Sequence, residues 1–347
     1  MTDAPCSASK VPRSTAVSPR SESDGSRGKS GALPEGFLDF IAPDADRFGQ
    51  LKAMLEKRGL HPSVLDLAGS RHILLAPSGQ GRQFLHDAAQ PGMQPGTQLR
   101  SQLHTQLRVL VAHWDRARGS PGANDNSAAV FQLAEAATRL NASGDDKWLV
   151  LFTDREEAAG AEGPRGQGSY ALAEGFRTIG LGQAEFYIFD ACGRGDTVII
   201  STAVDELLGN EGEEGSLRAK RSARDLRLKV LEAGRTICAG RLLLAPTPFS
   251  DDVGFLAAGL TAQTITVLPV KEAATLAGAL RSKPELAATL VSREARSGQG
   301  GSQNRRPDAL WMPRTWTLLH SPKDDAASLT PSVFPLVERL ALALAKR

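Results

Sequence analysis

The sequence predicts an α/β fold with a mostly parallel central sheet flanked by helices. From residue 108 onward, short apolar segments alternate with amphipathic segments that have helical periodicity. The apolar segments lack alternating polar positions, which is typical of parallel strands covered by helices on both faces. With 347 residues, of which 41% are hydrophobic, the chain can bury a substantial core.

The first 33 residues differ in composition from the remainder of the chain. They are rich in Ser, Arg, Lys, Gly and Pro and poor in large apolar side chains, so they cannot bury enough surface to offset the entropy of ordering. We therefore expect a disordered tail over 1–33 and a single domain over 34–347. Ordered structure is expected to begin in "PEGFLDFIAPDADRFGQLKAMLEKRGL" (34–60), whose later part has helical periodicity.

Seven strands and six helices are predicted after this segment. The expected strands are 108–113, 147–153, 185–191, 197–202, 240–245, 263–269 and 315–320. The expected helices are about 127–141, 167–180, 217–236, 251–259, 271–280 and 331–346. The polar, Gly-rich stretch 292–309 predicts a mobile surface loop.

Composition argues against several classes of function. The formal net charge is only +2, and no basic face with interleaved aromatic residues is evident, so a nucleic-acid partner is not expected. No apolar stretch approaches the roughly 20 residues of a membrane helix. The N-terminus lacks the apolar core of a secretory signal, and three cysteines make no disulfide framework. These features predict a cytoplasmic protein, with its oligomeric state left open.

Ligand-type residues follow several of the predicted strands and lie just before a predicted helix. In open α/β sheets such positions meet at the carboxyl edge, where ligands bind. The set is, in chain order, His113, Asp125, Glu156, Glu157, Asp190 and His320. Imidazoles and carboxylates suit two divalent ions of the zinc type. Without cations, four carboxylates in one place would repel one another, so the clustering itself favours metal binding.

The motifs that contain these residues are "HWD", "GAND", "REE", "FDACG" and "LLHSPKDD". Together and in this order, over roughly residues 100–345, they resemble the co-catalytic zinc aminopeptidase family. That family includes bacterial zinc aminopeptidases, glutamate carboxypeptidases and glutaminyl cyclases. The resemblance implies a zinc aminopeptidase-like (phosphorylase/hydrolase-like) fold. No single motif is specific, but the ordered set is.

The resemblance also implies a role for each residue. His113 and Asp190 would hold one zinc ion, Glu157 and His320 would hold the other, and Asp125 would bridge the two. Glu156 would be the general base that accepts a proton from the attacking water. Asp115 would orient His113 through its other ring nitrogen.

The sequence departs from the family pattern at two positions. Asp251 and Asp252 stand where the family often has Ser-Asp-His, and they are expected either to bind substrate or only to cap a helix. Leu319 stands before the last His, where the family often has an aromatic residue and the cyclases usually have Trp.

The predicted function is that of an aminopeptidase, a metallo-exopeptidase that hydrolyses N-terminal peptide or small amide bonds with two zinc ions. The alternatives are a glutaminyl-peptide cyclotransferase with one metal and a non-catalytic member of the fold.

Overall fold

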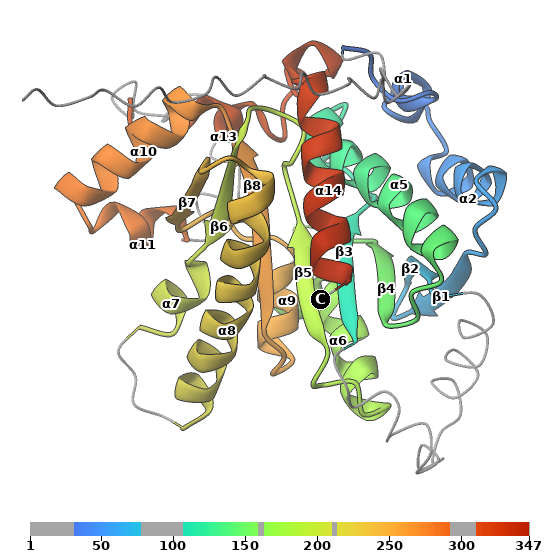
Figure 1. The fold of residues 1–347 in the computed structure, drawn as a ribbon, viewed down its shortest axis with the longest axis horizontal. Helices are drawn as coiled ribbons and strands as arrows, with labels where there is room; N and C mark the ends of the chain where they lie inside the picture. Colours follow the sequence, from blue (N-terminus) through green and yellow to red (C-terminus); the bar gives the residue numbers. More distant parts are fainter. Residues whose placement is uncertain (1–30, 78–106, 159–162, 210–213, 292–309, 347) are drawn as a thin grey trace, which may run out of the picture.

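The computed structural model describes residues 31–77, 107–158, 163–209, 214–291 and 310–346. Within these residues an eight-stranded sheet has the order β1-β2-β4-β3-β5-β8-β6-β7 (Figure 1). The strands are β1 (Ser63–Leu67), β2 (Ser70–Leu75), β3 (Arg108–His113), β4 (Trp148–Thr153), β5 (Glu185–Phe189), β6 (Thr197–Ser201), β7 (Leu242–Ala245) and β8 (Ala262–Leu268). Six of the seven predicted strands are therefore present, within three residues at each end.

The middle of the sheet is parallel and its edges are mixed. β3 pairs in parallel with β4 and β5, and β5 pairs in parallel with β8. β6 runs antiparallel to β8 and parallel to β7, and β1 and β2 form an antiparallel hairpin against β4. Because β3, β4 and β5 run in one direction, their carboxyl ends lie at the same edge of the sheet.

Helices cover both faces of this sheet. The helices are α1 (Phe37–Phe40), α2 (Arg47–Lys57), α5 (Ala128–Ser143), α6 (Gly168–Thr178), α7 (Ala203–Leu207), α8 (Glu214–Ile237), α9 (Asp251–Ala257), α10 (Val270–Ser282), α11 (Leu286–Leu290), α13 (Arg314–Leu318) and α14 (Phe334–Ala345). Shorter helical turns are η1 (Ala123–Ser127), η2 (Gly163–Gly166), η3 (Ala326–Ser328) and η4 (Pro331–Val333).

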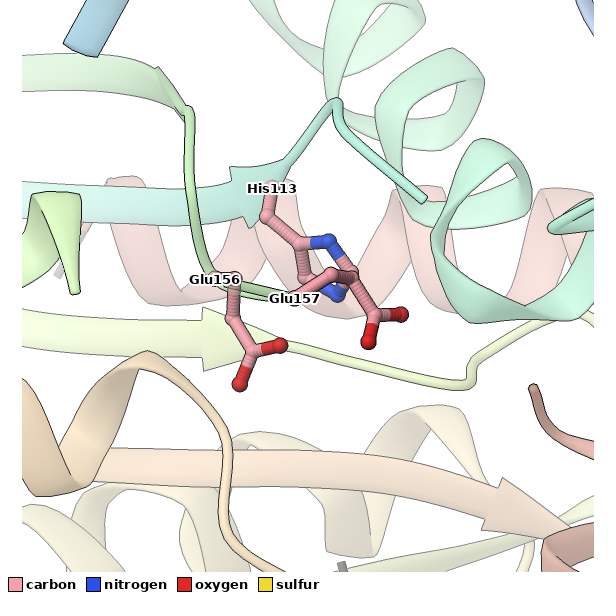
Figure 2. A group of neighbouring side chains, drawn as sticks. All are labelled: His113, Glu156 and Glu157. Atoms are coloured by element: carbon pink, nitrogen blue, oxygen red, sulfur yellow. The ribbon is translucent and has the colours of Figure 1, made fainter. Parts of the chain in front are cut away.

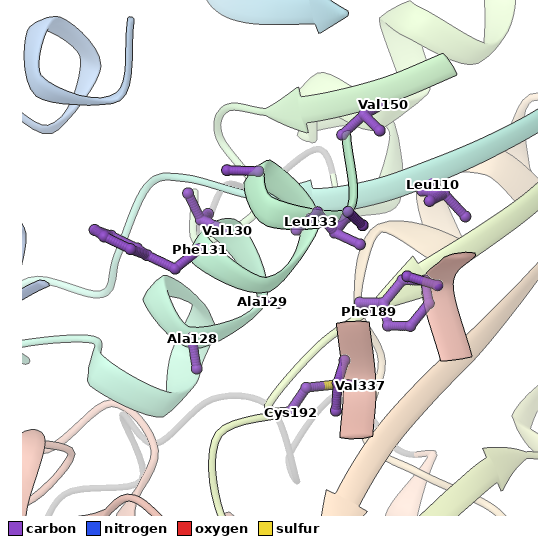
Figure 3. Close-up of a cluster of buried hydrophobic side chains, with 14 of the residues drawn as sticks. Leu110, Ala128, Ala129, Val130, Phe131, Leu133, Val150, Phe189, Cys192 and Val337 are labelled. Carbon is purple, nitrogen blue, oxygen red and sulfur yellow. The ribbon is translucent and has the colours of Figure 1, made fainter. Parts of the chain in front are cut away.

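The apolar side chains of the strands alternate between the two covered faces. On one face α5, α8 and α14 pack over strand residues such as Leu110, Val150 and Phe189 (Figure 3). On the opposite face α6 and α9 pack over residues such as Val109 and Val111. Removing apolar side chains from water stabilises the fold by roughly 25 cal/mol per Å² of buried surface. Because these strands are buried on both faces, their sequences are continuous apolar runs.

The prediction of a strand over 315–320 is wrong. Residues 315–318 lie instead in α13, which begins after Pro313 and ends at Leu318, two residues before His320. The backbone N–H of Thr315, at the start of this helix, donates to Glu272 of α10 at 2.8 Å. Trp316 packs in a cluster with α10 and α11. Tertiary contacts therefore override the strand preference of Thr and Trp.

The hairpin of β1 and β2 is an addition that the sequence analysis did not predict. Its turn consists of Ala68 and Gly69, both with positive φ (49° and 77°), as a two-residue hairpin turn requires. β2 pairs with β4 and so extends the sheet beyond the strand that precedes the two glutamates.

The predicted tail and loop fall mainly outside the described residues. Residues 1–30 and 292–309 are not described, so the disordered tail, the mobile loop and the single domain over 34–347 remain predictions. Leu33 packs against the core, and Phe37 is fully buried against Phe131 and Phe334. Within the described ranges, every helix is too short or too polar to cross a bilayer.

Candidate metal centre

The six predicted ligand and base residues come together at the carboxyl edge of the parallel strands. His113 is the last residue of β3, Asp190 follows β5, and the two glutamates follow β4. Asp125 lies in η1, between β3 and α5. His320 follows helix α13 rather than a strand, so three strands, η1 and α13 contribute to the site.

Asp125 lies at the middle of this group, and its two carboxylate oxygens face different histidines. Oδ1 is 3.2 Å from Nε2 of His113, and Oδ2 is 3.1 Å from Nε2 of His320. The same His113 nitrogen is 3.7 Å from Oδ1 of Asp190. The same His320 nitrogen is 3.1 Å from Oε2 of Glu157. A carboxylate divided in this way is suited to bridging two cations.

Two sets of three ligand atoms follow from these distances. The first, here called the His113 position, consists of His113, Asp125 and Asp190. The second, the His320 position, consists of Asp125, Glu157 and His320. In each set the ligand atoms lie within 4.8 Å of one another, as a single ion requires. A third set, His113 with Glu156 and Glu157, meets the same criterion, so proximity alone does not separate the two glutamates.

Local hydrogen bonds explain why Asp125 is held in this place. Its neighbour Asn124 accepts a hydrogen bond from the backbone N–H of Gly193 at 2.7 Å, and Asn126 donates to the carbonyl of Phe189 at 2.8 Å. Both contacts tie the segment to the end of β5, which carries Asp190. Gly122, with φ of 64°, begins the segment, and a Cβ there would lie 2.7 Å from the carbonyl oxygen of Asp125. Only glycine fits this turn.

The two adjacent glutamates point their carboxylates to different sides (Figure 2). Glu157 faces His320, whereas Oε1 of Glu156 accepts a hydrogen bond from Nε2 of Gln167 at 3.2 Å. This difference favours Glu157 as the metal ligand and Glu156 as the base.

Asp115 contacts both halves of the site. Its Oδ1 is 3.4 Å from Nδ1 of His113, the ring nitrogen that faces away from the other carboxylates. Its two oxygens also accept the backbone N–H groups of Glu156 and Glu157, at 3.3 and 3.0 Å. Its position therefore matches the expected orienting role, and it holds the glutamate segment as well.

Several buried atoms of the site lack hydrogen-bond partners, which tests whether the residues fit a metal. Oε1 of Glu157 and Oδ1 of Asp190 are buried and accept no hydrogen bond among the described residues, and Nε2 of His113 faces only carboxylate oxygens, at 3.2 and 3.7 Å. A buried lone pair without a donor costs about 1–3 kcal/mol. Cations at the two positions would supply a partner to all three atoms. The donor set of imidazole nitrogens and carboxylate oxygens fits zinc.

Electrostatics at the site couple the histidines to the carboxylates. Burial lowers the pKa of His113, but Asp115, Asp125 and Asp190 raise it more, and it lies well above its usual value. Burial likewise lowers the pKa of His320, yet the carboxylate of Asp125 and that of Glu157 raise it to about 9. Burial raises the pKa of Asp125, but the two histidines outweigh it and hold that pKa well below its usual range. In the absence of metal, protons on the two imidazoles offset part of the negative charge of the carboxylates.

Zinc binding should therefore release protons. With a pKa of about 9, His320 is protonated at pH 7, and its Nε2 must lose that proton to bind a cation. At least one proton should be released per chain at pH 7, and the number should fall as the pH rises through about 9. Calorimetric zinc titration in buffers of different ionisation enthalpy measures this number. His320→Ala should release fewer protons than the natural chain, and zinc uptake without proton release at pH 7 would contradict the assignment.

Unusual backbone conformations gather at the site. Five non-glycine residues among those described have positive φ, and three lie at or beside site residues: Arg155 (59°), Ala191 (51°) and His320 itself (57°). A left-handed conformation costs an ordinary residue about 1–2 kcal/mol. Such residues persist where the surrounding structure fixes them, and they are frequent at functional sites.

Asp251 and Asp252 lie behind the site at the start of α9, and both are buried, with 0% and 3% of their surface exposed. Oδ2 of Asp251 accepts from the hydroxyl of Thr153 at 2.7 Å, and Oδ1 of Asp252 accepts from the backbone N–H of Ser250 at 2.9 Å. Burial raises the pKa of Asp251 to about 6 and that of Asp252 to about 7. Asp252 thus contacts the backbone at the start of the helix, as a cap does, whereas Asp251 contacts β4 instead. Substrate binding by the pair remains a prediction.

Two residues of the site were not recognised in the sequence. Gln167 precedes α6 and contacts Glu156, and Asp324, four residues after His320, contacts the Asp125 segment. The only signal for Asp324 was its place in "LLHSPKDD", and Gln167 had none.

A model of peptidase family M28 matches residues 96–345. No curated protein matches the chain.

Solved structures resemble the fold at low sequence identity. The aminopeptidase LapA of Legionella pneumophila is 14% identical with a TM-score of 0.53, and the match covers 88% of this chain and 66% of LapA. The glutaminyl cyclase of Porphyromonas gingivalis is 15% identical with a TM-score of 0.52, covering 89% of this chain and 93% of the cyclase. A Zn-dependent exopeptidase of Parabacteroides distasonis is 13% identical with a TM-score of 0.52, covering 90% and 95%. This chain thus spans just under two thirds of the length of LapA.

Proposed function

The chain belongs to peptidase family M28, and from that premise we propose that it is a zinc-dependent aminopeptidase that binds two zinc ions. One observation carries the proposal. Asp125 turns one carboxylate oxygen toward His113 and the other toward His320, at 3.2 and 3.1 Å, so that two sets of three ligands share it. The His113 position and the His320 position would each hold one ion.

Zinc, when bound, lowers the pKa of a water ligand to about 7 and polarises the carbonyl oxygen of a substrate. The chain's own residues supply the proton transfers. Glu156 accepts a proton from the attacking water and returns it to the departing amine, while Gln167 holds its carboxylate at 3.2 Å. Asp115 fixes the ring of His113 and the backbone of both glutamates.

The substrate is a peptide or small amide with a free N-terminal amine. Carboxylates outnumber imidazoles at the site, and His320 has 28% of its side chain exposed, so the His320 position borders solvent. A positively charged amine at the end of a substrate is the group that this acidic, partly open site would attract. This supports an exopeptidase over an endopeptidase.

Glutaminyl cyclisation remains the alternative function. It needs one metal, whereas two sets of ligands that share Asp125 favour two ions. Leu319 also stands where the cyclases usually have Trp.

Product analysis separates the two activities. A panel of aminoacyl-nitroanilides and a peptide with N-terminal Gln are incubated with the zinc-loaded protein. An aminopeptidase releases free amino acids from both, and a cyclase converts the Gln peptide to a pyroglutamyl peptide of unchanged length. Inactivity on all substrates after zinc or cobalt loading would overturn the proposal and favour a non-catalytic member of the fold.

A further inference from the structure

Asp324 joins two segments of the site that are far apart in the sequence. It lies in the turn that follows His320, and it is fully buried. Its Oδ1 accepts the backbone N–H of Asn124 at 2.8 Å, and its Oδ2 accepts the backbone N–H of Asp125 at 3.1 Å. Its own carbonyl oxygen accepts the backbone N–H of Ala123 at 3.0 Å. Three consecutive amides before and at Asp125 thus donate to one residue.

The turn that carries Asp324 is itself tied to His320. The hydroxyl of Ser321 donates to the carbonyl of Leu318 at 2.6 Å, and the backbone N–H of Asp324 donates to the carbonyl of Ser321 at 3.1 Å. His320 lies within the first of these turns, between Leu318 and Ser321, and has a φ of 57°. A change in the position of Asp324 would therefore be transmitted to His320 over only four residues.

Asp324 contacts the backbone of the Asp125 segment and makes no hydrogen bond to a metal-ligand side chain among those described. Its negative charge lies close enough to Asp125 to repel that carboxylate, and the repulsion contributes to the raised pKa of Asp324, after burial. Two buried carboxylates are costly neighbours unless both are hydrogen-bonded or balanced by cations. The two amide hydrogen bonds are charge-assisted and therefore stronger than neutral ones, which explains how Asp324 is retained there.

We infer that Asp324 is a positioning residue for the His320 position: it holds the segment of Asp125 at a fixed distance from His320, so that the two can bind one ion together. This inference rests on the proposed zinc function. The His113 position depends on it less, because His113 and Asp190 are held by the ends of β3 and β5.

The inference predicts a selective loss of zinc affinity. Outer residues that orient metal ligands contribute roughly 10- to 100-fold to metal affinity. Asp324→Asn keeps the shape but replaces one acceptor oxygen by an NH₂ group that faces an amide N–H. Asp324→Ala removes both acceptors. We expect the zinc dissociation constant of the His320 position to rise about 10- to 100-fold, more for Asp324→Ala than for Asp324→Asn, with a smaller change at the His113 position.

Asp325 offers a matched control. It is the adjacent carboxylate, but it caps η3 by accepting the backbone N–H of Ser328 at 3.1 Å. Asp325→Asn makes the same change of charge one residue farther along and should leave both zinc affinities unchanged.

The measurement is a stepwise zinc titration of the full chain in competition with a chromophoric chelator, with thermal melting as the check on folding. The titration step that is lost in His320→Ala identifies the His320 position. Support requires weakening of that step in Asp324→Asn, no weakening in Asp325→Asn, and recovery of Asp324→Asn activity in excess zinc. If Asp324→Ala fails to fold, Asp324→Asn alone tests the positioning role of Asp324.

Three results would overturn the inference. The first is an unchanged zinc affinity of the His320 position in a folded Asp324→Asn variant, which leaves the proposed function intact. The second is equal weakening by Asp325→Asn, which would indicate a general effect of charge. The third is a natural chain that binds no zinc at all, which would overturn the proposed function together with the inference.

Discussion

Glu156→Gln should lower kcat by about 10²- to 10⁴-fold while the protein keeps its zinc, because general acid–base catalysis contributes on that order. Glutamine preserves the shape of the side chain and removes its basicity. Glu156 contacts Gln167, whereas the neighbouring carboxylate of Glu157 faces His320 at 3.1 Å. The substituted side chain therefore leaves the ligands of the His320 position in place. Turnover numbers and zinc content of the purified variant are the quantities to measure.

Glu157→Gln is the matched control, since it makes the same change one residue away. It should lose zinc from the His320 position and activity together. If Glu157→Gln keeps its zinc and loses only rate while Glu156→Gln loses metal, the two roles are reversed. Normal turnover by Glu156→Gln would show that Glu156 is not the base.

Asp125→Ala should have the largest effect on metal content, because Asp125 belongs to both sets of ligands. Removing it takes one of three ligands from each position, so both ions should be lost on dialysis and activity should be lost with them. His320→Ala removes a ligand from the His320 position alone and should keep about one ion per chain at the His113 position.

Zinc content after dialysis, measured on the two variants side by side, separates a bridging ligand from a ligand of one ion. Asp125→Asn is the more conservative change and is available should Asp125→Ala melt early. An Asp125→Ala variant that keeps as much zinc as His320→Ala would contradict the bridging role.

The parallel strands of the fold could be predicted because both of their faces are buried. β3 and β4 are buried at every position, and most of their residues are apolar. Such a run is typical of a strand covered by helices on both faces. The hairpin of β1 and β2 was missed because its turn is Ala68-Gly69, a weaker signal than Asn-Gly or Asp-Gly. α13 was mistaken for a strand because its start is fixed by Glu272, 43 residues away, which no local pattern reveals.

In the candidate site, too, some residues could be predicted from the sequence and others could not. Motif order supplied the metal-ligand assignments, and the structure brings those residues together. Asp324 could not be found from the sequence, because it acts on the amides of Asn124 and Asp125 across 200 and 199 residues. Backbone N–H groups carry no signature in the sequence. Residues that position ligands through the backbone are therefore recognised only in three dimensions.

The proposed chemistry depends on two zinc ions that share Asp125, and the zinc content of the natural chain shows whether both positions are filled. The protein is purified without chelator, dialysed, and analysed for metal per chain, then stripped and reloaded with zinc or cobalt. We expect about two ions per chain, with hydrolysis lost on stripping and restored on reloading. A chain that is metal-free as purified, takes up neither metal and remains inert would contradict it.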